Sequence, residues 1–200
     1  MNRIFYIMGK SASGKDRLYR NLLAYFSGNE PCLKPLISCT TRSKRSGEED
    51  GKDYFFTAPA AYLKDREEGR IIEERVYETV YGPWIYYTSA EHIDLAAGSY
   101  LGIGTLESFR SLSAYFGPER VVPVYIEVED GIRLFRALKR ERAEEKPGYE
   151  ELCRRFLSDA EDFSREKLEE AGIQRIFENN GAFEDCLDEI ISFIREFKDA

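Results

Sequence analysis

Histidine, paired cysteines and long apolar runs are scarce or missing in this sequence, and each shortage excludes a class of protein. The chain has one histidine, His92, and its cysteines form no Cys-x-x-Cys pair. Without such spacing we expect no structural zinc site. We also expect no disulfide framework, but four reduced thiols. The four are Cys32, Cys39, Cys153 and Cys186.

Membrane-spanning segments are missing as well. A helix that crosses a bilayer needs about 20 mostly apolar residues in succession, and no run in this chain approaches that length. The apolar segment 4–8 is too short for the core of a signal peptide. We therefore expect a cytoplasmic protein that does not contact a membrane.

Positive charge is not in excess. The net charge is −8, and residues 159–200 account for all of it with 13 acidic and 5 basic side chains. The rest of the chain carries 24 side chains of each sign. Because nonspecific binding of nucleic acid depends on a basic surface, we expect no nucleic-acid partner.

A glycine-containing stretch at residues 9–16 is the first informative feature. It follows the strand-like segment 4–8 and precedes Leu18, Leu22 and Phe26, whose spacing is typical of one helix face. Two glycines five positions apart and then a lysine match a P-loop, in which backbone N–H groups surround a phosphate. We predict that this stretch binds a nucleoside triphosphate. Its residues are Gly9, Lys10, Ser11, Ala12, Ser13, Gly14, Lys15 and Asp16.

The position after Lys15 departs from the P-loop pattern. A Ser or Thr hydroxyl usually holds Mg²⁺ there, whereas this chain has Asp16. A carboxylate is a hard oxygen ligand that also suits Mg²⁺. We predict that Asp16 is a metal ligand and that the triphosphate binds together with Mg²⁺.

Residues 38–54 form a second informative stretch, dense in hydroxyls, arginines and glycines. Arg42 and Arg45, three positions apart beside Ser38 and Tyr54, can bind a phosphate dianion through charge-assisted hydrogen bonds. The same composition also suits a basic loop that is merely exposed to solvent.

The pattern Ser-x-Thr-Thr-Arg-x-x-Arg-x-Gly-Glu-x-x-Gly-x-Asp-Tyr at 38–54 resembles the GMP-binding signature of guanylate kinases. The P-loop lies at the matching distance upstream. The resemblance implies an ATP-dependent kinase that converts GMP to GDP and requires Mg²⁺. It also implies which residues hold the acceptor phosphate. They are Ser38, Arg42, Arg45, Glu48 and Tyr54.

The resemblance extends to the acceptor base. The family has a glutamate that accepts from guanine N1–H and N2–H₂, and Glu73 aligns best with it, while Glu74 is one position away. Tyr81 matches a tyrosine that contacts the GMP phosphate. Pro83 stands near a family hydroxyl that approaches the base, and it cannot donate a hydrogen bond.

Residues 131–165 hold a cluster of basic side chains and resemble the mobile lid of guanylate kinases, whose arginines reach the migrating phosphoryl group. Such cations stabilise charge on the equatorial oxygens of the transition state. The matching residues are either Arg140 or Arg142, and either Arg154 or Arg155. For contact with the ATP base, the resemblance points to Asn180, with Asn179 as its alternative.

One departure concerns the metal region. The family has two aspartates near the metal and the acceptor, at positions matching Gly102 and Gly104. We expect Asp16 to replace part of this acidity, with Glu107 as a second candidate.

Apolar runs alternate with helical patterns along the chain, which favours a parallel sheet covered on both faces. We predict a three-layer α/β/α sandwich with a parallel central sheet, of the P-loop NTPase type, in one guanylate-kinase-like domain over 1–200. Residues 36–38 are expected to form a strand. The expected parts are a core at 1–35, 91–130 and 166–200, a GMP-binding insertion at 36–90 and a lid at 131–165.

Two other functions fit the sequence. Related kinases with Gly-Lys-Asp in the loop act on acceptors such as ribose 1,5-bisphosphate. Non-catalytic guanylate-kinase-like binding modules, which tend to lose the ATP loop, form another class. The sequence does not specify the oligomeric state.

Overall fold

The computed structural model describes residues 1–79 and 82–197. Its central sheet contains five parallel strands in the order β2-β7-β1-β8-β9. Their bounds are β1 Ile4–Gly9, β2 Leu33–Pro35, β7 Ser99–Gly104, β8 Val121–Glu127 and β9 Ile176–Glu178. The predicted parallel sheet is therefore confirmed.

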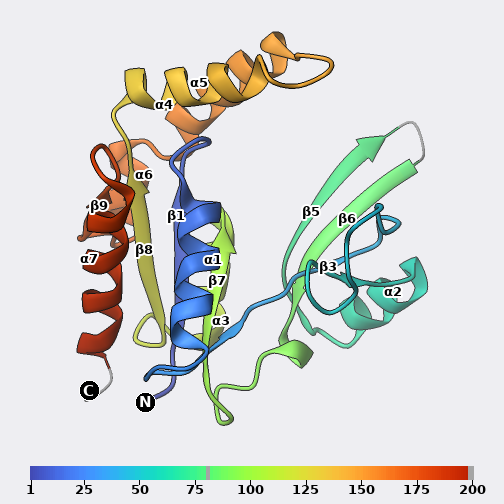
Figure 1. Ribbon diagram of the computed structural model, residues 1–200. Helices are drawn as coiled ribbons and strands as arrows, with labels where there is room; N and C mark the ends of the chain where they lie inside the picture. The colour runs from blue at the N-terminus through green and yellow to red at the C-terminus, as the bar shows by residue number, and fades with distance from the viewer. Residues whose placement is uncertain (80–81, 198–200) are drawn as a thin grey trace.

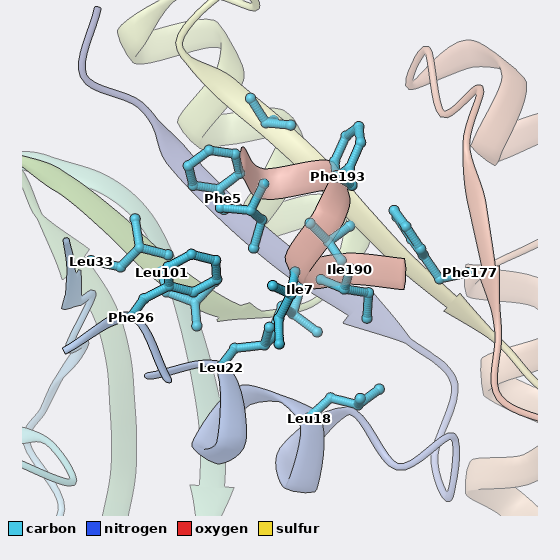
Figure 2. Close-up of a cluster of buried hydrophobic side chains, with 14 of the residues drawn as sticks. Phe5, Ile7, Leu18, Leu22, Phe26, Leu33, Leu101, Phe177, Ile190 and Phe193 are labelled. Atoms are coloured by element: carbon cyan, nitrogen blue, oxygen red, sulfur yellow. The ribbon is translucent and has the colours of Figure 1, made fainter. Parts of the chain in front are cut away.

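Helices cover both faces of this sheet (Figure 1). On one face, α1 (Lys15–Phe26) and α7 (Phe183–Glu196) pack against the strands, and their apolar side chains join those of β1 in one core (Figure 2). On the other face lie α3 (Leu106–Phe116) and α6 (Arg165–Glu170). The α/β/α sandwich is confirmed.

A second sheet, with the order β4-β3-β6-β5, lies on the far side of α1 from α7 (Figure 1). Its strands are β3 Cys39–Thr40, β4 Phe55–Phe56, β5 Ile71–Thr79 and β6 Gly82–Ser89. Helix α2 (Pro59–Glu67) packs on it through Tyr62, which contacts Tyr87 and Cys39 in a small separate core. A short 3₁₀ turn, Ala90–His92, leads back to the central sheet.

The predicted strand at 36–38 is wrong. The Leu36 N–H still donates to the Leu101 carbonyl at 2.8 Å, as a continuation of β2. The chain then leaves the central sheet and begins β3 at Cys39. Residues 36–38 form the crossing between the two sheets, so their extended, apolar character belongs to a connection.

Helices α4 (Asp130–Glu141) and α5 (Tyr149–Asp162) project beyond the carboxyl end of the central sheet, at the top of Figure 1. Helix α4 does not bury its apolar side, since Phe135 is 67% exposed. It buries Arg133, whose guanidinium lies 3.8 Å from the centre of the Phe156 ring. No helix in the described ranges is long and apolar enough to cross a membrane.

The packing of α1 gives a test of the fold. Leu22 is fully buried between α1 and the central sheet, so Leu22→Ala is expected to lower the free energy of unfolding by about 2–5 kcal/mol. Leu63→Ala on α2 is the matched control, because Leu63 is 54% exposed. Urea denaturation measures both. Equal losses in the two variants would contradict the assigned core.

Candidate active site

The loop between β1 and α1 lies at the carboxyl end of the central strands and needs both of its glycines. Gly14 has φ +88°, and a Cβ there would lie 2.6 Å from Nδ2 of Asn179. A Cβ on Gly9 would lie 2.6 Å from the carbonyl oxygen of Ile126. Neither position has room for a side chain, so the loop follows the strand closely and Lys15 begins the helix.

Asn179 holds this loop in place. Its buried side-chain amide donates to the Ser13 carbonyl at 2.8 Å, and its backbone N–H donates to the Glu127 carbonyl at 2.9 Å. The loop is thereby tied to the ends of β8 and β9. Asn180, the predicted contact of the ATP base, instead accepts from the Glu129 N–H at 2.8 Å.

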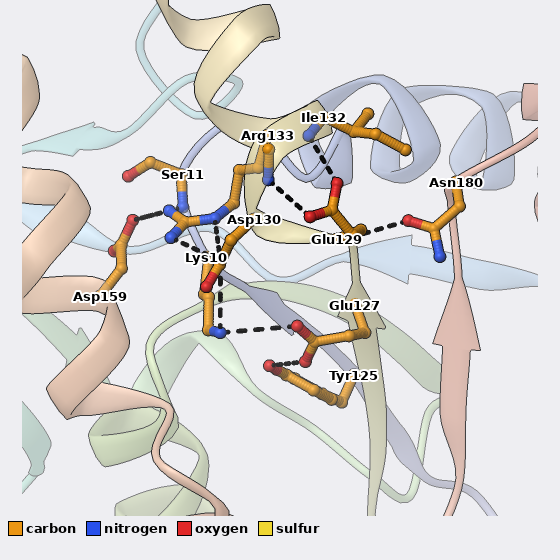
Figure 3. Close-up of polar contacts among 11 residues, drawn as sticks. Lys10, Ser11, Tyr125, Glu127, Glu129, Asp130, Ile132, Arg133, Asp159 and Asn180 are labelled. Carbon is orange, nitrogen blue, oxygen red and sulfur yellow. Dashed lines mark hydrogen bonds and ion pairs between the residues drawn. The ribbon is translucent and has the colours of Figure 1, made fainter.

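Carboxylates of helices α4 and α5 already contact groups of the loop between β1 and α1 (Figure 3). Asp159 of α5 accepts from the Ser11 N–H at 2.7 Å and pairs with Arg133 at 3.2 Å. Arg133 also pairs with Asp130 at 3.0 Å, while Lys10 lies 3.5 Å from Glu127. Arg133 and Asp159 are not among the site residues predicted from the sequence. The three-residue spacing of Asp130 and Arg133 was a signal for their pair, but none pointed to Asp159.

The four arginines predicted to lie in a lid differ in position. Arg140 and Arg155 line a small pocket beside Ser11 of the loop, together with Arg133 and Phe156. Arg154 points into solvent and pairs with Glu151 at 2.7 Å. Arg142 is exposed at the end of α4. The structure therefore brings Arg140 and Arg155 to the loop and leaves Arg142 and Arg154 away from that pocket.

A cavity of about 1260 Å³ separates α1 from the second sheet. Four of the predicted site residues line it, namely Lys15, Asp16, Ser38 and Tyr54. Its wall on the second sheet is aromatic and carries one arginine. The lining residues of β5 and β6 include Arg75, Tyr77, Trp84 and Tyr86.

Arg42 is ordered by Glu48. The guanidinium donates to both carboxylate oxygens of Glu48, at 2.9 and 2.8 Å, and to the Tyr86 hydroxyl at 2.9 Å. Arg42 is buried and is not part of the cavity lining. Arg45 is exposed, and its N–H donates to Glu48 at 2.8 Å. Hydrogen bonds from Arg42 and then from the Arg45 N–H lower the pKa of Glu48 to about 2.

Glu73 and Glu74 point to opposite sides of β5. Glu74 accepts from the Tyr62 hydroxyl on the α2 side. Glu73 lies on the side of α3, where its oxygens accept from the hydroxyls of Thr88 on β6, at 2.8 Å, and Ser108 on α3, at 3.2 Å. Glu73 is not part of the cavity lining. Tyr81, predicted to contact the acceptor phosphate, lies outside the described residues.

Tyr6 explains the two glycines at the positions of the family aspartates. It pairs with Gly102 across β1 and β7, and a Cβ on Gly102 would lie 2.6 Å from its ring. A Cβ on Gly104 would overlap its hydroxyl oxygen. Burial, followed by the charge of Glu73, raises the pKa of Tyr6 well above the usual value. Glu107, the second acidic candidate, is exposed and does not line the cavity.

A glycine loop at the carboxyl end of a parallel sheet, beside a cavity between α1 and a second sheet, is the arrangement of α/β proteins that bind a ligand at this edge. Residues 1–98 match the family model described as guanylate kinase. The guanylate kinase of Thermotoga maritima is 40% identical over 81 residues, which is 40% of this chain and 37% of that protein. That of Bordetella pertussis is 36% identical over 93 residues, or 46% of this chain and 40% of the relative.

The matched segments thus span less than half of these curated relatives. Over the whole chain, the solved structure of guanylate kinase from Anaplasma phagocytophilum superposes with a TM-score of 0.64 at 21% identity, covering 98% of this chain and 86% of the other. The chain is therefore similar to the guanylate kinases over its first 98 residues, and its fold matches that of a guanylate kinase.

The Arg42–Glu48 pair gives a pH-dependent test. The depressed pKa of Glu48 stabilises the folded state above its ordinary value of 4.5, and this contribution is lost as the pH falls toward about 2. Glu48→Gln should lower the thermal unfolding midpoint at pH 7, and the deficit should shrink as the pH falls below 4.5. Glu49→Gln, exposed and adjacent, is the control. A deficit that does not change with pH would contradict the pairing.

Proposed function

We propose that the protein is an ATP-dependent nucleoside monophosphate kinase that converts GMP to GDP. The observation that carries the proposal is that the two segments predicted to bind phosphate both contribute residues to one cavity. Lys15 and Asp16 line it from the start of α1, directly after the loop, and Ser38 and Tyr54 line it from the segment that resembles the acceptor signature.

The reaction needs positioned cations more than proton transfer. An oxygen of the GMP phosphate forms a bond to the γ-phosphorus of ATP, and the bond to the β,γ-bridging oxygen breaks, releasing ADP. Because the attacking oxygen is already anionic, no general base is required. Lys15, Arg140 and Arg155 would stabilise the charge on the migrating phosphoryl group. A phosphate oxygen would replace the Asp159 carboxylate at the Ser11 N–H.

The residues present fit a metal that arrives with ATP. Asp16 is exposed and lines the cavity next to Lys15. Among the residues that the structure describes, no group of three or more acidic, histidine or cysteine side chains could hold a metal alone. Mg²⁺ commonly binds one or two carboxylates together with substrate phosphates. Bound in this way, Mg²⁺ would neutralise charge on the β- and γ-phosphates.

The parts of the chain take separate roles in this proposal. Residues 36–90 would form the acceptor-binding insertion, residues 131–165 would form the lid, and the core would position the loop. Closure of the lid would exclude water and limit hydrolysis of ATP. We also propose a cytoplasmic location, in keeping with these small-molecule substrates.

The first test is a coupled assay of ADP formation with GMP, AMP and ribose 1,5-bisphosphate as acceptors. We expect turnover with GMP. Lys15→Ala should lower kcat by about 10²–10³-fold, since it removes a preorganised donor to the transition state. Lys64→Ala on the exposed side of α2 is the control. Turnover with ribose 1,5-bisphosphate alone, or full activity of Lys15→Ala, would contradict the proposal.

A second test concerns Asp16. If its carboxylate holds Mg²⁺, Asp16→Ala should lower kcat with MgATP by at least about tenfold. The affinity for ATP measured without Mg²⁺ should not fall, because a negative charge beside the phosphates is removed. An unchanged kcat would refute the metal role of Asp16.

A further inference from the structure

Arg75 stands out among the cavity residues because its hydrogen-bonding capacity is unused. It lies on β5 with its side chain 30% exposed and lines the cavity beside Tyr77 and Tyr86. Within residues 1–79 and 82–197 its guanidinium makes no hydrogen bond, and its buried Nε has only an ion-pair contact, with Glu73. Arg42, in contrast, donates to Glu48, Tyr86 and the backbone.

Glu73 lies behind Arg75 and positions it. Nε of Arg75 is 3.4 Å from a carboxylate oxygen of Glu73, which is itself held by the hydroxyls of Thr88 and Ser108. The Glu73 side chain is only 6% exposed and is not part of the cavity lining. A ligand in the cavity therefore meets the guanidinium of Arg75 rather than the carboxylate of Glu73.

The strand register places Arg75 at a suitable separation from the acceptor-phosphate segment. Arg75 on β5 pairs with Tyr86 on β6, and Tyr86 pairs with Thr40 on β3. Directly paired residues point to the same face of a sheet. With strands about 4.8 Å apart, the backbones of Arg75 and Thr40 are about 10 Å apart. Tyr54 of that segment also lines the cavity, and its ring centre lies 5.6 Å from that of Tyr86, so a nucleotide phosphate at Tyr54 and its base at Arg75 could share the cavity.

We propose that Arg75 selects the acceptor base by donating two hydrogen bonds to O6 and N7 of a 6-oxopurine. This inference rests on the proposed function and specifies its acceptor. A planar guanidinium matches this pair of acceptor atoms, whereas adenine presents an amino donor at position 6 that opposes it.

The residues around Arg75 are compatible with recognition of the O6 and N7 edge of the base. Tyr77, Trp84 and Tyr86 provide aromatic surface for the purine ring. Pro83 on β6 has no N–H to offer to O6. Because Arg75 contacts only the O6 and N7 edge, it does not contact the exocyclic amine at position 2. The acceptor class is therefore the 6-oxopurine nucleoside monophosphates, so IMP binds as well as GMP does.

Isothermal titration of the wild-type protein with GMP, IMP and AMP tests the proposal directly. The expected result is similar affinity for GMP and IMP, and affinity for AMP that is lower by about 5- to 150-fold. The proposal would be overturned if IMP bound as weakly as AMP. That result would mean that the amine at position 2 is read instead.

Variants then assign the effect to Arg75. Arg75→Ala should weaken GMP and IMP by about 5- to 150-fold and leave AMP unchanged, and Arg75→Lys should restore only part of the loss. Arg66→Ala is the matched control, because Arg66 pairs with Glu74 on the opposite side of β5. Equal weakening of all three nucleotides in Arg75→Ala, or no weakening at all, would overturn the assignment. Should these variants fail to fold, the wild-type comparison of IMP with GMP decides.

The same titrations and variants, together with the phosphoryl-transfer assay, test this inference separately from the proposed function. Wild-type protein that phosphorylates GMP while Arg75→Ala retains full preference over AMP would reject the role of Arg75 alone. Wild-type protein that binds GMP and IMP as expected but transfers no phosphate to either would reject the kinase, while the selection by Arg75 would stand.

Discussion

The close approach of Asn179 to the loop after β1 is the constraint on which the rest of the site depends. Its amide donates to the Ser13 carbonyl and lies where a side chain on Gly14 would be. This contact ties the loop to the ends of β8 and β9, and it requires the positive φ that only glycine adopts without strain. The N–H groups that can bind an anion, the start of α1 and the position of Lys15 all follow from it.

Two groups predicted to bind phosphate already have partners within the protein. Arg42 is bound by Glu48, and the Ser11 N–H is bound by Asp159. Such pairing spares the protein an unpaired buried charge, which would cost several kcal/mol. It also orients the groups. Arg75 differs from these groups, since its position is fixed by an ion pair while its hydrogen bonds remain unused.

The local sequence determines most of the fold, and less of the site. Glycine spacing and helical periodicity were enough to predict the loop, α1 and the parallel sheet. They could not separate a strand at 36–38 from a connection between sheets, because both are extended and apolar. The burial of Arg133, the filling of space above Gly104 by Tyr6 and the contact of Asp159 with the loop depend on residues far apart in sequence. No local pattern encodes them.

The central claim is that both phosphate-binding segments serve one cavity, so that a phosphoryl group crosses directly between two bound nucleotides. Titration with adenosine and guanosine joined through their 5′ oxygens by a chain of five phosphates tests it most directly. If the two segments are opposed across the cavity, this compound binds at least about 100-fold more tightly than ATP or GMP alone, because one binding event places both ends. Affinity no greater than that of ATP would contradict the account.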